Sequence, residues 1–308
     1  MLMKKSFIVG ILVIIVLISG CTKNTDTGTD GPFQGGTEGV SVEFVNLAPP
    51  SSFSQNEPTK VKVLLKNQGE TRVQTGNAKV KLFGVTLNNF GLPSNYKGTL
   101  GPLEPKGEFT AEGGEQEVEI GTINYKLSII NQETYTLRAY LCYPYQTIMK
   151  TDVCVLSLLT QESGSSVCDL TGEKIGSGTV SGAPIQVTSL TEQTRGSDQV
   201  RFDIKIENKG TGDVFLIDSK CEDLDTDEAR FESKDKIKVK IKSPIDVNCG
   251  FRSGEPGQEG IVTLDETGVA TLSCWKNVEE PVVDKLDVQL DYLYREQAIK
   301  QITIYQKR

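Results

Sequence analysis

Two stretches of the chain decide how it folds: residues 61–73 (VKVLLKNQGETRV) and residues 202–214 (FDIKIENKGTGDV). Aligned with each other, they superimpose Asn67 on Asn208 at an offset of 141 residues. In both, apolar and polar residues alternate and an Asn-x-Gly follows, which is the pattern of a half-buried β-strand that enters a turn. The sequence therefore predicts an internal repeat of one β-rich unit.

A second match lies at the other end of each repeat. Residues 137–145 (LRAYLCYPY) align with residues 286–294 (LDVQLDYLY) at an offset of 149, and the same register places Val153 on Ile302. Each segment is interpreted as the closing β-hairpin of its unit, with the turn of the first hairpin centred on Ile148. The change of offset makes the second unit eight residues longer in its middle, since 149 − 141 = 8.

These matches predict an all-β protein with two tandem immunoglobulin-like β-sandwich domains. The first spans residues 40–159, a Ser/Gly-rich connection spans 160–182, and the second spans 183–308. Each unit of about 120 residues is long enough to enclose one sandwich core.

An alternating strand followed by Asn-x-Gly resembles the immunoglobulin-like modules of prokaryotic surface proteins, especially the CARDB type (cell-adhesion-related domains of bacteria and archaea). Residues 35–73, with Gly36-Thr37-Glu38-Gly39-Val40, Pro49-Pro50 and Lys66-Asn67-Gln68-Gly69, are also similar to exported archaeal proteins. The motifs are short, so the resemblance implies a sandwich fold and a surface location and carries over no catalytic residue.

The N-terminal residues predict export. Lys4 and Lys5 precede an apolar run over residues 7–18, which is shorter than the roughly 20 apolar residues that a membrane-spanning helix needs. Residues 18–21 (ISGC) resemble the lipobox of prokaryotic lipoproteins, in which the cysteine is lipidated. Residues 1–20 are therefore interpreted as a lipoprotein signal peptide, Cys21 as the lipid anchor on the outer face of the cell membrane, and residues 21–39 as a flexible tether. An ordinary signal peptide and an uncleaved anchor are the alternatives.

The six remaining cysteines are expected to form three disulfides in an exported chain. They are Cys142, Cys154, Cys168, Cys221, Cys249 and Cys274. A hairpin centred on Ile148 would place Cys142 opposite Cys154, the turn-rich segment between Cys249 and Cys274 favours their pairing, and Cys168 with Cys221 would follow by elimination.

Composition narrows the function. The chain has 33 basic and 41 acidic side chains and no histidine, so its net charge of −8 becomes −10 once Lys4 and Lys5 are removed. The acidic balance argues against nucleic acid, and the lack of histidine excludes Ser-His-Asp and Cys-His catalysis and imidazole zinc sites. No cofactor or metal is expected. Residues 223–228 (DLDTDE) fail the EF-hand pattern at Glu228 and Lys234, which leaves a solvated acidic loop or a calcium site of another geometry.

Aromatic residues have two interpretations. A ligand platform is one use for the six tyrosines of the closing segments, but Tyr143 and Tyr292 continue the apolar face of their strands and are expected in the core. The six are Tyr135, Tyr140, Tyr143, Tyr145, Tyr292 and Tyr294. Trp275 follows Cys274 and is expected to pack on its disulfide rather than to bind a ligand.

The leading hypothesis is a non-enzymatic, lipid-anchored surface protein for adhesion, scaffolding or binding of an envelope protein or polysaccharide. Its contact regions are expected in the loops at residues 87–97 and 221–232. The alternative is a ligand-binding lipoprotein subunit of a membrane transport or envelope complex, which a concave pocket would favour. An enzyme ranks third, and a cleft with paired carboxylates would support it.

Overall fold

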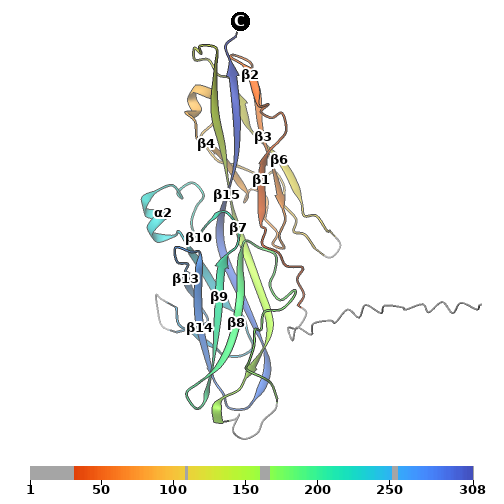
Figure 1. Ribbon diagram of the computed structural model, residues 1–308, viewed down its shortest axis with the longest axis vertical. Coiled ribbons are helices and arrows are strands. Elements are labelled where there is room, and N and C mark those ends of the chain that lie inside the picture. The colour runs from red at the N-terminus through yellow and green to blue at the C-terminus, as the bar shows by residue number, and fades with distance from the viewer. Residues whose placement is uncertain (1–30, 108–109, 160–166, 252–255, 308) are drawn as a thin grey trace, which may run out of the picture.

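The computed structural model describes residues 31–107, 110–159, 167–251 and 256–307, and these form an elongated all-β protein (Figure 1). The first half of the chain contains β1 (Val40–Phe44), β2 (Ser52–Ser54), β3 (Thr59–Asn67), β4 (Lys79–Phe83), the 3-10 helix η1 (Leu87–Phe90), β5 (Lys97–Gly98), β6 (Glu115–Ile123) and β7 (Gln132–Val155). The second half contains β8 (Ile185–Arg195), β9 (Gln199–Asn208), β10 (Asp213–Leu216), α2 (Asp227–Glu232), β11 (Lys236–Ile241), β12 (Asn248–Cys249), β13 (Glu259–Thr263), β14 (Val269–Asn277) and β15 (Val282–Tyr305).

The strands form three sheets, which are antiparallel apart from the parallel pair β2 and β15. One sheet has the order β1-β3-β6, a second has the order β12-β14-β9-β8, and an eight-stranded sheet follows the path β13-β11-β15-β7-β4-β5 with β2 and β10 beside β15. The expected all-β architecture with several antiparallel sheets is confirmed.

Strands β7 and β15 are each 24 residues long and pair over their whole length, from Val155 opposite Val282 to Gln132 opposite Tyr305. At about 3.3 Å per residue this ribbon is roughly 80 Å long. It runs along the long axis of the molecule (Figure 1). We call β1–β6 with residues 132–143 and 294–305 the first unit, and β8–β14 with residues 145–155 and 282–292 the second unit.

The two predicted closing hairpins are wrong. Ile148 lies inside β7 instead of at a turn, and the second half of β7 pairs with β15 of the second unit, while the second half of β15 returns to the first unit. Pro144 stands opposite Leu293, its counterpart in the repeat, so the two halves exchange strands about a local two-fold relation. The predicted borders at residues 159 and 183 assumed closed hairpins and stay a prediction, because the exchanged strands cross them.

Apolar and polar residues alternate along the strands, and the apolar ones point inward to form the core. In the first unit, β3 buries Val61, Val63 and Leu65 while β7 buries Leu137 and Leu141. The second unit repeats this arrangement with the buried residues Phe202, Ile204 and Ile206 of β9 and Leu286, Val288 and Leu290 of β15. All belong to one continuous apolar cluster that passes through the junction of the units, which we call the waist. The units are therefore packed together as well as paired.

Residues 31–36 do not hang free as the predicted tether would. Gly31 and Phe33 donate backbone hydrogen bonds to Ser177 and Gly178 of the connection, at 2.9 and 3.0 Å. The carboxylate of Glu70 accepts hydrogen bonds from three backbone N–H groups, those of Gln34, Gly35 and Gly182. The described part of the connection, residues 167–182, is likewise packed: Thr179, Val180 and Ser181 are buried. The chain thus enters the fold at the waist.

The predicted signal peptide at residues 1–20 and Cys21 lie outside the described residues. Within the described ranges, neither η1 nor α2 nor any other helix has the length and apolar character that a bilayer crossing requires.

Candidate functional site

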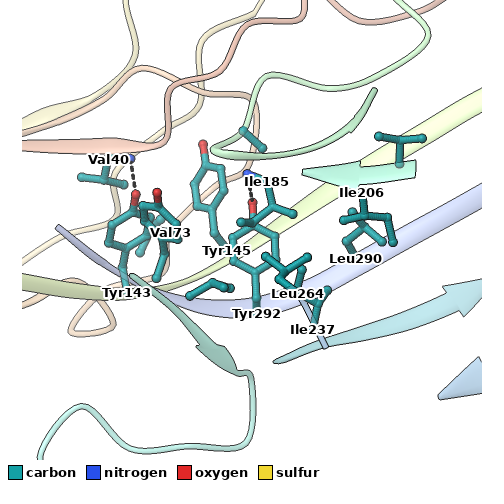
Figure 2. Close-up of a cluster of buried hydrophobic side chains, with 14 of the residues drawn as sticks. Val40, Val73, Tyr143, Tyr145, Ile185, Ile206, Ile237, Leu264, Leu290 and Tyr292 are labelled. Atoms are coloured by element: carbon teal, nitrogen blue, oxygen red, sulfur yellow. Dashed lines mark hydrogen bonds between the residues drawn. The ribbon is translucent and has the colours of Figure 1, made fainter. Parts of the chain in front are cut away.

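Four tyrosines fill the waist: Tyr143 and Tyr145 of β7, and Tyr292 and Tyr294 of β15. All four are buried, and the ring centroids of neighbours lie 5.5 to 6.5 Å apart in edge-on or tilted contacts. Figure 2 shows three of them side by side among aliphatic residues. The expected core position of Tyr143 and Tyr292 is confirmed, and none of the four offers a ring to a ligand.

Each tyrosine hydroxyl has a polar partner inside its own repeat. The N–H of Val40 donates to the Tyr143 hydroxyl at 3.0 Å, and the N–H of Ile185 donates to the Tyr292 hydroxyl at 3.5 Å (Figure 2). Burial raises the pKa of Tyr143 and of Tyr292 well above the ordinary value, so both stay neutral hydrogen-bonding groups. The waist is a satisfied polar network and not a titrating site.

A second contact between the units lies beside the waist. Residues 213–235, which hold β10 and α2 and which we call the lateral clamp, reach across to β4 and β7 of the first unit. Cys221 of the clamp forms a disulfide with Cys142 of β7. The two cysteines pack with Phe215, Leu224 and Leu293 in a small separate apolar cluster.

Arg295 is the charged centre of this contact. Its guanidinium lies 4.4 Å from the ring centroid of Tyr140 and 5.1 Å from that of Phe215, and it pairs with Asp213 at 3.1 Å and Asp225 at 2.8 Å. Its side chain is only 10% exposed. Because its guanidinium stacks on two aromatic rings and pairs with two aspartates, Arg295 fixes the clamp against β15.

The acidic segment 223–228 is therefore not a free loop. Asp225 also pairs with Lys81 of β4 at 2.9 Å, and the preceding Glu222 pairs with Lys79 of β4 at 2.9 Å, so the start of this segment is bound to the first unit. No group of three potential metal ligands occurs among the residues that the structure describes. The expected binding loop at residues 221–232 lies within the clamp, and its role in binding a partner stays a prediction.

The described residues form three disulfides, but two of the predicted pairings are wrong. Cys249 pairs with Cys274 as expected, because β12 and β14 place them directly opposite each other. Cys142 pairs with Cys221, and Cys154 pairs with Cys168. Cys142 and Cys154 stand at separate points of one straight strand, so they cannot meet. Both errors come from treating residues 132–155 as a hairpin, whereas they form one continuous strand.

A buried carboxylate lies next to the Cys154–Cys168 disulfide. Glu192 of β8 accepts a hydrogen bond from the Cys154 N–H at 2.8 Å, and its second oxygen lies 3.3 Å from Nζ of Lys174. Burial raises the pKa of Glu192 to about 7, although Lys174 acts in the opposite direction. Through its contact with Lys174, Glu192 holds the connection against the second unit.

An open cavity with a volume of about 610 Å³ lies at the far end of the first unit. We call it the distal pocket. Its aromatic floor consists of Phe90, Tyr125 and Tyr135, whose ring centroids lie 4.9 to 5.5 Å apart. Its walls are the turn after β4, η1 and the start of β7, represented by Gly84, Val85, Thr86, Asn89, Thr134 and Thr136.

The expected binding loop at residues 87–97 contributes Asn89 and Phe90 to this pocket, while its Phe90 and Leu92 are buried. Tyr125 was not expected beside this loop. Tyr125 follows the end of β6 and Tyr135 lies near the start of β7, so aromatic residues close to these two strand ends were the available signal. The guanidinium of Arg195 lies 4.4 Å from the ring centroid of Trp275, and the expected packing of Trp275 on the Cys249–Cys274 disulfide stays a prediction.

Comparisons with known proteins assign no family. No family model matches the chain, and no curated protein matches it. Among solved structures, it aligns with the adhesin CfaE of enterotoxigenic E. coli at 8% identity, over 91% of this chain and 89% of that chain, with a TM-score of 0.12. It also aligns with the collagen adhesin CNA of S. aureus at 10% identity, over 91% and 95% of the two chains, with a TM-score of 0.09. Scores this low support no argument about fold or function.

Proposed function

We propose that this chain is an exported, lipid-anchored surface protein that acts as a stiff, non-enzymatic binding rod. The observation that carries the proposal is the β7–β15 ribbon, in which 24 consecutive residue pairs join both units. A rod built on one uninterrupted ribbon bends less than two domains on a linker. Such stiffness suits a protein that holds a binding surface at a fixed distance from its attachment point.

The position of the chain entry supports the same role. Residues 31–36 are bound at the waist, so an anchor at Cys21 would attach to the middle of the rod and leave both ends accessible. Within this proposal, the units are two immunoglobulin-like sandwiches of the CARDB type that have exchanged their last strands. The distal pocket lies at one accessible end.

The anchor is tested by the variant Cys21→Ser. Wild-type protein should fractionate with membranes and be degraded by protease added to intact cells, whereas the variant should appear in the medium or in a soluble fraction. A variant that stays membrane-bound would contradict lipidation at this residue, and protection of the wild-type protein from added protease would contradict surface display.

The binding role is tested with the soluble variant. Labelled Cys21→Ser protein should bind to envelopes of its own cells in a saturable manner, and unlabelled protein should displace it. Binding that never saturates would contradict the role.

The distal pocket favours a second candidate, a lipoprotein that delivers a small ligand to a transporter. Its volume of about 610 Å³ is within the range of small-molecule sites. This candidate predicts that the wild-type protein copurifies with a membrane transporter, whereas the binding rod predicts retention by the envelope.

A further inference from the structure

The distal pocket lies on an open edge of β7. Strand β4 pairs with β7 only from Lys79 opposite Cys142 to Phe83 opposite Arg138, while β15 follows the other edge of β7 as far as Gln132. The chain leaves β4 at Gly84, where φ is +89°. A Cβ at Gly84 would lie 3.0 Å from the carbonyl oxygen of Thr136, so glycine allows the chain to turn away close to β7.

The backbone direction along β7 shows which groups face this edge. In an antiparallel strand the N–H and C=O groups of alternate residues point to opposite sides. The N–H of Lys150 donates to Thr179, and the carbonyl of Ile148 accepts from Ser181, so even-numbered residues face away from β15. The same alternation directs the N–H and C=O of Thr134 and Thr136 toward the pocket.

Two other edges of the protein are protected. Strand β6 presents Glu115, Glu117 and Glu119 along its length, and charged side chains discourage pairing. The edge of β8 is covered, because Lys174 donates to the carbonyl of Leu190. Residues 134–136 are Thr-Tyr-Thr, an uncharged sequence that favours strand pairing.

We propose that the distal pocket binds an extended peptide segment of an envelope protein, which adds as a strand to β7 along Thr134–Thr136. The peptide backbone pairs with the four groups that Thr134 and Thr136 direct to the edge. One apolar side chain of the peptide lies against Tyr135, which is partly exposed, and the hydroxyls of Thr86 and Thr136 and the amide of Asn89 contact the polar backbone. Main-chain pairing gives affinity in such sites, and the side-chain pocket gives selectivity.

This inference rests on the proposed binding role and names its ligand. The probe is a display library of short random peptides, selected on the soluble Cys21→Ser protein. Selected peptides should alternate apolar and polar residues, and they should slow hydrogen exchange at the amides of Thr134 and Thr136.

Two substitutions locate the site. Asn89→Trp fills the pocket rim and should lower peptide affinity about tenfold or more, while Asn88→Trp places the same side chain on the adjoining exposed position outside the pocket. Thr136→Pro removes one edge donor without removing a bond to β15 and should lower affinity about tenfold. Thr136→Val keeps that donor and loses only the side-chain hydroxyl, so it should lower affinity less than Thr136→Pro does. Melting temperatures would show that each variant is folded.

The outcomes separate this inference from the binding role. If the soluble protein binds envelopes and Asn89→Trp binds them equally well, the rod role stands and the peptide site is wrong. If no peptide is selected, or if selected peptides protect other amides, the site is also wrong. Binding of a glycan array that Asn89→Trp abolishes would assign the pocket to carbohydrate and overturn the peptide inference. Loss of all saturable envelope binding would instead contradict the rod role.

Discussion

Tyr145 donates its hydroxyl to the side-chain oxygen of Asn67 across 2.9 Å, and the repeat makes the same bond between Tyr294 and Asn208, also at 2.9 Å. Each asparagine then donates to a carbonyl four residues later, that of Thr71 or of Gly212. The Asn-x-Gly turn that marks the repeat in the sequence is thus held by a tyrosine from the end of the same repeat. These bonds fix each unit to the ribbon just where the strands cross.

Substitution of Tyr145 by Phe should lower the free energy of unfolding by about 1–2 kcal/mol, because it removes a hydrogen bond to a buried partner. Tyr294→Phe should cost less, since Asn208 is partly exposed whereas Asn67 is buried. Urea unfolding without reductant measures both. Tyr305→Phe, at an exposed tyrosine, is the control. Equal stability of Tyr145→Phe and wild type would show that the bond contributes nothing.

The local features of the fold could be predicted from the sequence, while the long-range pairing could not. Alternation identified β3 and β9, and the repeated Asn and Tyr positions reflect equivalent contacts. A straight strand and a hairpin have the same alternation, so residues 132–155 and 282–305 fitted both. The missed signal was the lack of turn residues: neither segment contains Gly or Asn, and the only Pro is Pro144.

The candidate site was harder to predict for the same reason. The distal pocket joins η1 to β7 only because β4 stops at Phe83 while β7 continues, and strand length relative to a neighbour is not encoded in either strand alone. The clamp depends on Asp225 meeting Lys81 and Arg295, which are 144 and 70 residues away. Such contacts follow from the strand exchange, which the repeat pattern leaves undetermined.

Replacement of Arg295 by Ala should lower the free energy of unfolding by about 2–3 kcal/mol, because it removes two ion pairs and two ring contacts of a nearly buried guanidinium. Arg295→Lys should recover only part of this loss, since an ammonium group cannot stack on Tyr140 and bind two carboxylates at once. Thermal unfolding of the oxidised protein measures the effect.

The matched control is Arg72→Ala, which breaks an exposed pair with Glu104 and should cost less than about 1 kcal/mol. Similar losses at Arg72 and Arg295 would mean that the clamp does not hold the units together.

Glu192 should make stability depend on pH. Its pKa rises from an ordinary 4.5 to about 7 in the folded protein, so the folded state holds the proton more tightly than the unfolded state. The resulting stabilisation is complete below pH 4.5 and is lost as the pH rises from 4.5 to 7. Glu192→Gln should therefore lack this loss, and its stability relative to wild type should rise over that window. Glu266→Gln, at an exposed position, should follow the wild-type profile. Parallel profiles for wild type and Glu192→Gln would rule out this linkage.

Disulfide mapping tests the strand exchange directly. Digestion of the oxidised protein should release a peptide with Cys142 linked to Cys221, and another with Cys154 linked to Cys168. A Cys142–Cys154 link would mean that β7 folds back as a hairpin, and the exchanged arrangement would then be wrong.

Removal of the Cys142–Cys221 bond should destabilise the protein more than removal of the Cys154–Cys168 bond. The first links residues 79 positions apart and the second links residues 14 apart, so the first removes more freedom from the unfolded chain. The chain-entropy estimate gives about 4.5 kcal/mol for the longer loop and about 3 kcal/mol for the shorter. The double variants Cys142→Ser/Cys221→Ser and Cys154→Ser/Cys168→Ser form a matched pair, and urea unfolding compares them.

The Cys142→Ser/Cys221→Ser variant should also loosen the clamp, because Cys221 packs on Phe215 and Leu224. Faster hydrogen exchange should therefore appear in residues 213–235. If the shorter loop proves the more important, the units are held by the ribbon and the tyrosines alone, and the clamp is dispensable.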